Sequence, residues 1–296
     1  MGKELAEAYP EARDVFGEVD EALSLSLSSL CFEGPGEELT LTHNAQPALL
    51  AHGAAVWRVV MGTLRPHVRA AAGHSLGEHT AYHAAGSTSL KEAAKLVRRR
   101  GQLMFDEGTR RPGAMAAILG KLKQSVDSLC AQATRDAGLV VPANYNTEEQ
   151  IVVSGEVSGV DRVMELAREA GAIRALRLPV SGAFHSPLME PAEKGLREAL
   201  ASTSFAEPAF PVFSNVTEGE STGADDAREL LASQLTSPVR WAGEITNIAS
   251  RFPDALFVEL GPGAVLTGLL SRIVPRAHGV ACGTPVEVEK LLAQIA

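Results

Sequence analysis

The sequence predicts an α/β protein with an α/β-hydrolase-like parallel-sheet core and an inserted, ferredoxin-like (βαββαβ) small domain. Short apolar runs alternate with longer segments of helical periodicity along most of the chain. One such run, residues 68–73, leads through a glycine-flanked turn into a helical segment. Between residues 113 and 180 the elements follow a different order, which indicates a second folding unit.

The two outer segments, residues 1–112 and 181–296, are predicted to form the large domain. Helices are expected at the N-terminus with a break at Pro10, over 45–64, and over 89–104 with Ser89 as N-cap. The later part predicts strands at 212–215 and 255–260 and helices at 185–200, 227–235, 241–251 and 265–273.

The inserted segment, residues 113–180, is predicted to form the small domain. Strands are expected at 114–119, 140–144, 150–153 and 172–178, and helices at 125–133 and 158–170. This order of elements is ferredoxin-like.

The composition bounds the class of protein. The 296 residues are 45% hydrophobic and 21% charged, which is typical of globular proteins. A net charge of -9 argues against nucleic acid as a partner. The three cysteines are far apart, without CxxC spacing, so we expect neither disulfides nor a metal site. No apolar run is long enough for a bilayer and no secretion signal is present, so we expect a cytoplasmic protein without membrane contact.

The strongest local motif is G-x-S-x-G at residues 73–77. A serine on a tight strand-to-helix turn needs small neighbours two residues away on each side, and its hydroxyl stands clear of the sheet. Ser75 is therefore the candidate nucleophile, and the Leu76 N–H is a candidate oxyanion donor. The alternative is an ordinary turn with Ser75 as the helix N-cap.

A serine nucleophile requires a base, and the chain has eight histidines. His185 stands out because it lies where the chain leaves the inserted segment and begins a helix. Taken alone, a single histidine there is better explained by a structural role.

Several motifs in one order resemble the malonyl-CoA:acyl carrier protein transacylases and the acyltransferase domains of polyketide synthases. The resemblance covers essentially the whole chain. It rests on residues 42–50 (THNAQPALL), 73–78 (GHSLGE), 99–104 (RRGQLM), 113–117 (GAMAA), 144–146 (NYN), 181–189 (SGAFHSPLM), 238–241 (PVRW) and 259–263 (ELGPG).

The resemblance implies a Ser–His pair that carries the acyl group. Ser75 attacks the thioester of malonyl-CoA, and His185 takes and returns its proton. The backbone carbonyl of Gln234 is expected to orient the imidazole, and Asn146 to lie near the CoA and the histidine. The acyl group then passes to the phosphopantetheine thiol of acyl carrier protein, in fatty-acid or polyketide synthesis.

Substrate selection is expected to depend on two further residues. Arg100 matches the family arginine that pairs with the malonyl carboxylate, and a guanidinium suits that task. Consecutive helical residues cannot share a face, so Arg98 and Arg99 are expected to face solvent or the acidic carrier. Phe184 is expected to narrow the space beside the α-carbon, as in malonyl-selective members.

The sequence departs from the family at two places. Nothing matches the family's first strand and its P-G-Q-G-S-Q-type loop, whose glutamine supplies the second oxyanion donor. We therefore expect the chain as written to be poorly active. His79 stands where the family usually has an aromatic residue.

Two alternative functions remain open. One is a serine hydrolase or thioesterase on a similar core, although the sequence offers no convincing candidate for an acidic residue in the order Ser, acid, His. The other is a low-activity, N-terminally truncated homologue. The family is usually monomeric and holds no permanently bound cofactor.

Overall fold

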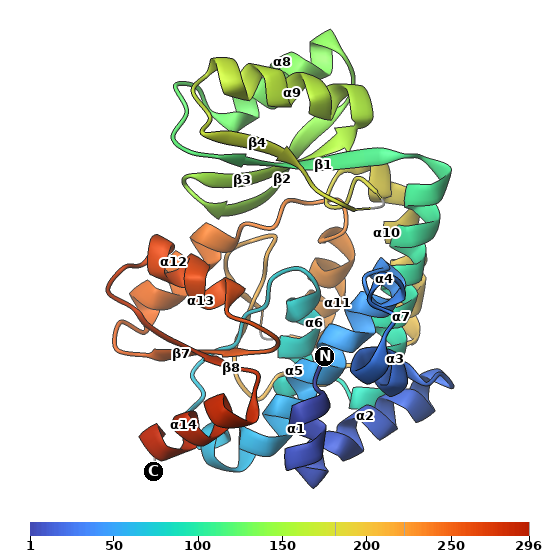
Figure 1. The fold of residues 1–296 in the computed structure, drawn as a ribbon, viewed down its shortest axis with the longest axis vertical. Coiled ribbons are helices and arrows are strands. Elements are labelled where there is room, and N and C mark those ends of the chain that lie inside the picture. The colour runs from blue at the N-terminus through green and yellow to red at the C-terminus, as the bar shows by residue number, and fades with distance from the viewer. Residues whose placement is uncertain (181, 222, 296) are drawn as a thin grey trace.

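The computed structural model describes residues 1–180, 182–221 and 223–295. A large body of helices and short strands carries a small sheet domain at one end (Figure 1). The α/β class is confirmed, because helices cover both antiparallel and parallel strands. Of the 181–189 motif, Ser181 lies outside the described residues.

The N-terminal part of the large body is helical. The break at Pro10 is confirmed, because this residue begins a second helix. Ser89 caps its helix as predicted, accepting a hydrogen bond from the Glu92 N–H at 3.2 Å. The helices are α1 (Lys3–Ala8), α2 (Pro10–Leu23), α3 (Leu27–Glu33), α4 (Gly36–Leu39), α5 (Thr42–Leu64), a 3₁₀ turn (Arg65–His67), α6 (Leu76–Ala84) and α7 (Leu90–Arg110).

The C-terminal part completes the large body. The helix predicted from residue 185 begins instead at Glu190, after a 3₁₀ turn (Pro187–Met189), so His185 precedes it. The elements are α10 (Glu190–Ser202), β5 (Val212–Phe213), β6 (Glu220–Ser221), α11 (Ala224–Ser233), α12 (Trp241–Arg251), β7 (Leu256–Leu260), α13 (Val265–Ile273), β8 (His278–Cys282) and α14 (Pro285–Ile295).

The parallel pairing in the large body is short. β7 pairs with β8 in parallel, from Leu256 opposite His278 to Leu260 opposite Cys282. The strand predicted at 68–73 is extended chain with a single parallel bridge, between Ala71 and Val212. α5 packs against α2, α6 and α7, and much of its surface is buried. Among the described helices, none combines the length and apolar character needed to cross a bilayer.

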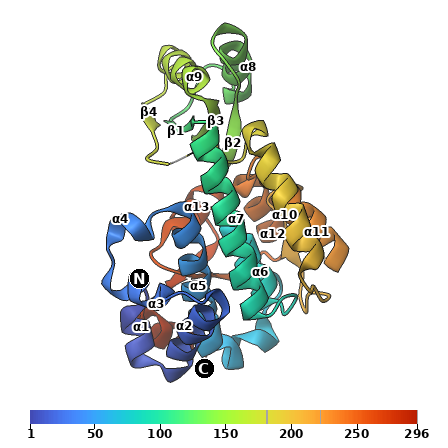
Figure 2. The same ribbon diagram turned by 90° about the vertical axis from the view of Figure 1, so that its right-hand side faces the viewer.

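The small domain follows the βαββαβ order. It contains β1 (Gly113–Leu119), α8 (Val126–Asp136), β2 (Val140–Thr147), β3 (Gln150–Glu156), α9 (Val157–Glu169) and β4 (Arg174–Arg177). The strands form an antiparallel sheet in the order β2-β3-β1-β4. α8 and α9 cover the face that points away from the large body, so the other face of the sheet looks toward it (Figure 2).

Candidate active site

Ser75 lies on a sharp turn between the extended segment that ends at Gly73 and the start of α6. Its backbone has φ 51° and ψ −104°, a conformation that side-chain-bearing residues rarely adopt. A Cβ atom at Gly73 would overlap the backbone of Gly77. The turn therefore requires glycine at residue 73 and raises Ser75 at the N-terminus of a helix.

His185 lies beside the serine, 110 residues away in sequence. Its Nε2 is 2.8 Å from Ser75 Oγ, and its Nδ1 is 2.9 Å from the Gln234 carbonyl oxygen. Because a carbonyl can only accept, Nδ1 carries the hydrogen and Nε2 has the free lone pair. The pair can transfer the hydroxyl proton from Ser75 to His185.

The environment keeps the imidazole neutral. Burial, and next the positive charge of Arg100, lower the pKa of His185 to about 3. A neutral imidazole at physiological pH is the form that can accept a proton.

Arg100 brings its guanidinium from α7 to the serine and is 1% exposed. Nη2 donates to Ser75 Oγ at 3.0 Å and to Gln234 Oε1 at 2.8 Å. Nη1 donates to Gln46 Oε1 at 2.6 Å. Burial lowers the pKa of Arg100 to about 10, which leaves it charged at neutral pH. The site can thus receive an anionic group beside the nucleophile.

The prediction for the neighbouring arginines is correct only for Arg99, which is exposed. Arg98 is partly buried and donates to the His43 carbonyl at 2.6 Å and to the Asn44 side chain. Arg98 therefore faces α5 more than solvent, and a contact with the carrier stays a prediction. Angular position on the helix does not reveal an acceptor on α5.

Leu76 is the first residue of α6, so its N–H has no partner within the helix. Among the described residues, no acceptor is recorded for this N–H, whereas Gly77 N–H donates to the His74 carbonyl at 2.9 Å. The Leu76 N–H and the positive end of α6 can together stabilise an oxyanion formed on a substrate.

Asn146 and Phe184 lie on the side of the small domain. Asn146, on β2, is buried, and its Oδ1 is 2.8 Å from His74 Nε2. Its recorded side-chain partner is thus His74 and not His185. Phe184 is partly buried and packs against both the large core and a small apolar cluster that includes Met115 of β1.

Four buried residues that surround the site carry no sequence signal of their own for a role there. Gln46 and Glu78 lie within two of the quoted motifs, and this position is the only sequence feature that could have marked them as site residues. Asn215 and Glu244 lie in no quoted motif. Glu78 and Glu244 are completely buried, and burial raises the pKa of both, for Glu78 to about 7.

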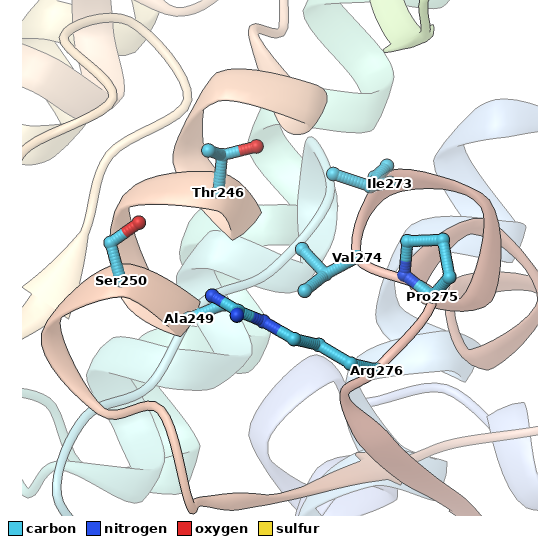
Figure 3. A pocket seen from close by; sticks show the side chains of 7 residues that line it. All are labelled: Thr246, Ala249, Ser250, Ile273, Val274, Pro275 and Arg276. Carbon is cyan, nitrogen blue, oxygen red and sulfur yellow. The ribbon is translucent and has the colours of Figure 1, made fainter.

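Two hollows in the described part of the chain lie away from the serine. A shallow pocket of about 360 Å³ lies between α12 and the segment after α13, and Arg276 extends across it toward α12 (Figure 3). A second, of about 540 Å³, lies along α10 near Thr236. Neither includes Ser75. Within the described parts of the chain, no three His, Cys, Asp or Glu residues gather as metal ligands would.

An α/β fold with a serine elbow and a hydrogen-bonded histidine defines a class of enzymes that transfer acyl groups through serine. Residues 1–286 match the acyl transferase domain family. The chain therefore belongs to the acyl transferase family.

Individual relatives agree with this assignment. A malonyl CoA-acyl carrier protein transacylase of Bacillus subtilis (strain 168) is 44% identical over 98% of this chain and 90% of its own length. The protein of that name from Escherichia coli (strain K12) is 38% identical over 96% of this chain and 92% of its own length.

Solved structures show the same similarity. An acyl-carrier-protein-S-malonyltransferase from Bartonella henselae superposes with a TM-score of 0.94, at 41% identity, covering 100% of this chain and 94% of that one. A malonyl-transacylase in complex with its type II PKS acyl-carrier protein gives 0.92, at 36% identity, covering 99% and 94%.

Proposed function

We propose that this chain transfers a malonyl group from malonyl-CoA to the phosphopantetheine thiol of acyl carrier protein, in fatty-acid or polyketide synthesis. The names of its relatives support this substrate and this partner. The observation that carries the proposal is that one oxygen, Ser75 Oγ, lies 2.8 Å from His185 Nε2 and 3.0 Å from Arg100 Nη2. A nucleophile beside a buried cation suits an acyl group that bears a carboxylate.

In the first half-reaction Ser75 Oγ attacks the thioester carbonyl carbon, and His185 Nε2 takes the hydroxyl proton. The negative charge on the carbonyl oxygen is stabilised by the Leu76 N–H. The carbon–sulfur bond then breaks, and CoA leaves as a thiol with the proton from His185. Ser75 now carries the malonyl ester.

In the second half-reaction the thiol of the carrier's phosphopantetheine attacks the ester carbonyl and gives its proton to His185. The ester bond to Ser75 breaks, and the serine oxygen recovers that proton. The malonyl group leaves as a thioester of the carrier. One thioester is exchanged for another, so no oxidant, reductant or permanently bound cofactor enters the balance.

Arg100 and Phe184 select the acyl group. The guanidinium of Arg100 pairs with the free malonyl carboxylate while the thioester carbonyl faces Ser75. Phe184 narrows the space at the α-carbon and disfavours an α-methyl group. A single methyl in an apolar pocket changes selectivity by about 1–3 kcal/mol, so this preference is graded.

The hydrolase alternative has less support. A serine hydrolase of this type uses an acidic side chain behind the histidine. Here the partner of His185 Nδ1 is a backbone carbonyl, that of Gln234. This partner matches the Ser–His pair that the family resemblance implies for the transacylases, and on that ground we favour transfer to a thiol over hydrolysis.

The test follows radiolabelled malonyl-CoA in the presence of holo acyl carrier protein. Label on Ser75 and then on the carrier supports the proposal, and release of free malonate indicates a hydrolase. Absence of label identifies a homologue without this activity. Ser75→Ala should abolish labelling, whereas Ser250→Ala, an exposed serine on α12, should not. Label retained at another residue in Ser75→Ala would refute the assignment.

We further infer that the reaction takes place in the cytoplasm and that the chain acts as a monomer. The separated cysteines and the monomeric habit implied by the family resemblance support this. Light scattering at micromolar concentration tests the oligomeric state, and a mass of twice the 31.2 kDa chain would contradict it.

A further inference from the structure

The serine elbow is strained and must be held by its surroundings. Ser75 has φ 51°, in the region where side-chain-bearing residues are disfavoured. Residues in this region are strained and persist only where neighbouring groups fix them. The turn's own backbone supplies two hydrogen bonds, from the Gly77 N–H to the His74 carbonyl at 2.9 Å and from the Glu78 N–H to the Ser75 carbonyl at 3.2 Å, and neither involves the Ser75 N–H or the Gly73 carbonyl.

The side chain of Asn215 bonds to the backbone on both sides of this turn. It comes from the loop after β5 and is completely buried. Oδ1 accepts the Ser75 N–H at 2.7 Å, and Nδ2 donates to the Gly73 carbonyl at 2.9 Å. One amide thereby fixes the peptide groups before and at the serine.

The amide orientation of Asn215 is itself determined. Oδ1 also accepts from Gln234 Nε2 at 3.3 Å, and Nδ2 also donates to Glu244 Oε2 at 2.8 Å. An asparagine side chain offers two donors and two acceptor sites, and all four are used here. A flipped amide would place its NH₂ against the Ser75 N–H and the Gln234 side-chain amide, and its oxygen against the Gly73 carbonyl.

The same arrangement links the serine to the histidine. Gln234 places its side-chain Nε2 against Asn215 Oδ1 and, at 3.1 Å, against the Ser75 carbonyl. Its backbone carbonyl accepts the hydrogen of His185 Nδ1. The Asn215 amide and the histidine are therefore held by one residue, which fixes Ser75 relative to His185.

We propose that Asn215 is the positioning residue that holds Ser75 at its reactive geometry relative to His185. The inference rests on the proposed function, in which Ser75 carries the acyl group. Asn215 is not placed in contact with the substrate, so it acts through the serine backbone. A displacement of about 1 Å at a reacting atom can reduce a rate by about 10²-fold.

Asn215→Asp gives the sharpest test because it keeps the shape of the side chain and replaces the donor by an acceptor. The new oxygen would face the Gly73 carbonyl and the Glu244 carboxyl. We expect the rate constant for acyl-serine formation from malonyl-CoA, measured by quenched flow without carrier, to fall by about 10²-fold. The dissociation constant of malonyl-CoA should stay at the wild-type value, because Arg100 is unchanged.

A matched control and a second variant keep the test decisive. Asn247→Asp changes an exposed asparagine of α12 and should leave the acylation rate unchanged. Asn215→Ala introduces no charge into the core, so it serves as the test variant if Asn215→Asp does not fold. It should also slow acylation.

The amplitude and the rate constant separate positioning from folding. A purely structural role would lower the amplitude of acylation, in proportion to the folded protein, and leave the rate constant at the wild-type value. That result in either variant would overturn the inference. If wild-type Ser75 itself takes no malonyl group, the proposed function fails instead.

Discussion

Glu78→Gln tests how burial and charge compete inside the site. Glu78 lies on α6, three residues after the nucleophile, and is completely buried. Its Oε2 accepts hydrogen bonds from Gln234 Nε2 at 2.7 Å and from the Asn215 N–H at 3.1 Å. Burial raises the pKa of Glu78 from 4.5 to about 7, although these hydrogen bonds and Arg100 oppose the shift.

The pKa shift of Glu78 determines the sign and size of its contribution to the unfolding free energy. The folded protein retains a proton on Glu78 that the unfolded chain releases between pH 4.5 and 7. The stabilisation from this group is therefore present below pH 4.5 and is lost as the pH rises through 7. A difference of about 2.5 in pKa corresponds to about 3 kcal/mol.

Urea unfolding of both proteins from pH 4.5 to pH 8 measures this contribution. A glutamine keeps one oxygen as acceptor and cannot titrate. The unfolding free energy of the wild type, relative to Glu78→Gln, should fall by about 3 kcal/mol as the pH rises. Titrating groups that do not face Glu78 are common to both proteins and cancel, whereas the pKa of Glu244, which burial and then the Glu78 charge raise, contributes to the same fall.

Glu92→Gln provides the control. Glu92 lies in the first turn of α7, where burial would raise its pKa but hydrogen bonds from Ser89 and Ser204 outweigh burial and lower it. Its contribution is present above the unfolded pKa and is lost as the pH falls through the folded one. A constant difference between wild type and Glu78→Gln across this range would refute the reasoning. A difference that rises with pH would show that Arg100 outweighs burial.

Three further predictions concern single residues. Arg100→Ala should lower kcat/KM for malonyl-CoA by about 10–10²-fold, through loss of charged hydrogen bonds, and lower kcat/KM for acetyl-CoA less. Competition between the two radiolabelled substrates measures the ratio of their kcat/KM values. Gly73→Ala should abolish serine labelling because its Cβ overlaps Gly77, whereas Gly17→Ala, with open space around it, should stabilise α2 by about 1 kcal/mol in urea unfolding. Ser89→Ala should destabilise the protein by about 1 kcal/mol through loss of the helix cap, and Ser89→Thr should restore most of it.

Features encoded by neighbouring residues could be predicted from the sequence. The helix break at Pro10 and the cap at Ser89 follow from local backbone chemistry. The order of elements in the small domain follows from hydrophobic periodicity. By contrast, β8 was not predicted, because its five residues, HGVAC, carry too few apolar side chains for a periodic signal.

The supporting groups of the site could not be predicted in the same way. The bond from Asn215 Oδ1 to the Ser75 N–H joins residues 140 positions apart. Nothing near Asn215 or Glu244 in sequence marks them, because their roles are defined only by what the fold places opposite them. The Ser75–His185 pair was assigned through family resemblance, since one histidine among eight cannot be chosen by spacing alone.

The charge on Arg100 favours an anionic acyl group in a second way, besides pairing with its carboxylate. In the free protein burial lowers the pKa of His185, and the charge on Arg100 lowers it further. On the proposed function, a malonyl carboxylate paired with Arg100 would neutralise that charge and make His185 a stronger base beside Ser75. An acetyl group lacks the carboxylate, so His185 would remain a weak base. The same guanidinium would then contribute to substrate binding and to the basicity of His185. We therefore expect acetyl-CoA to show a lower kcat and a higher KM than malonyl-CoA.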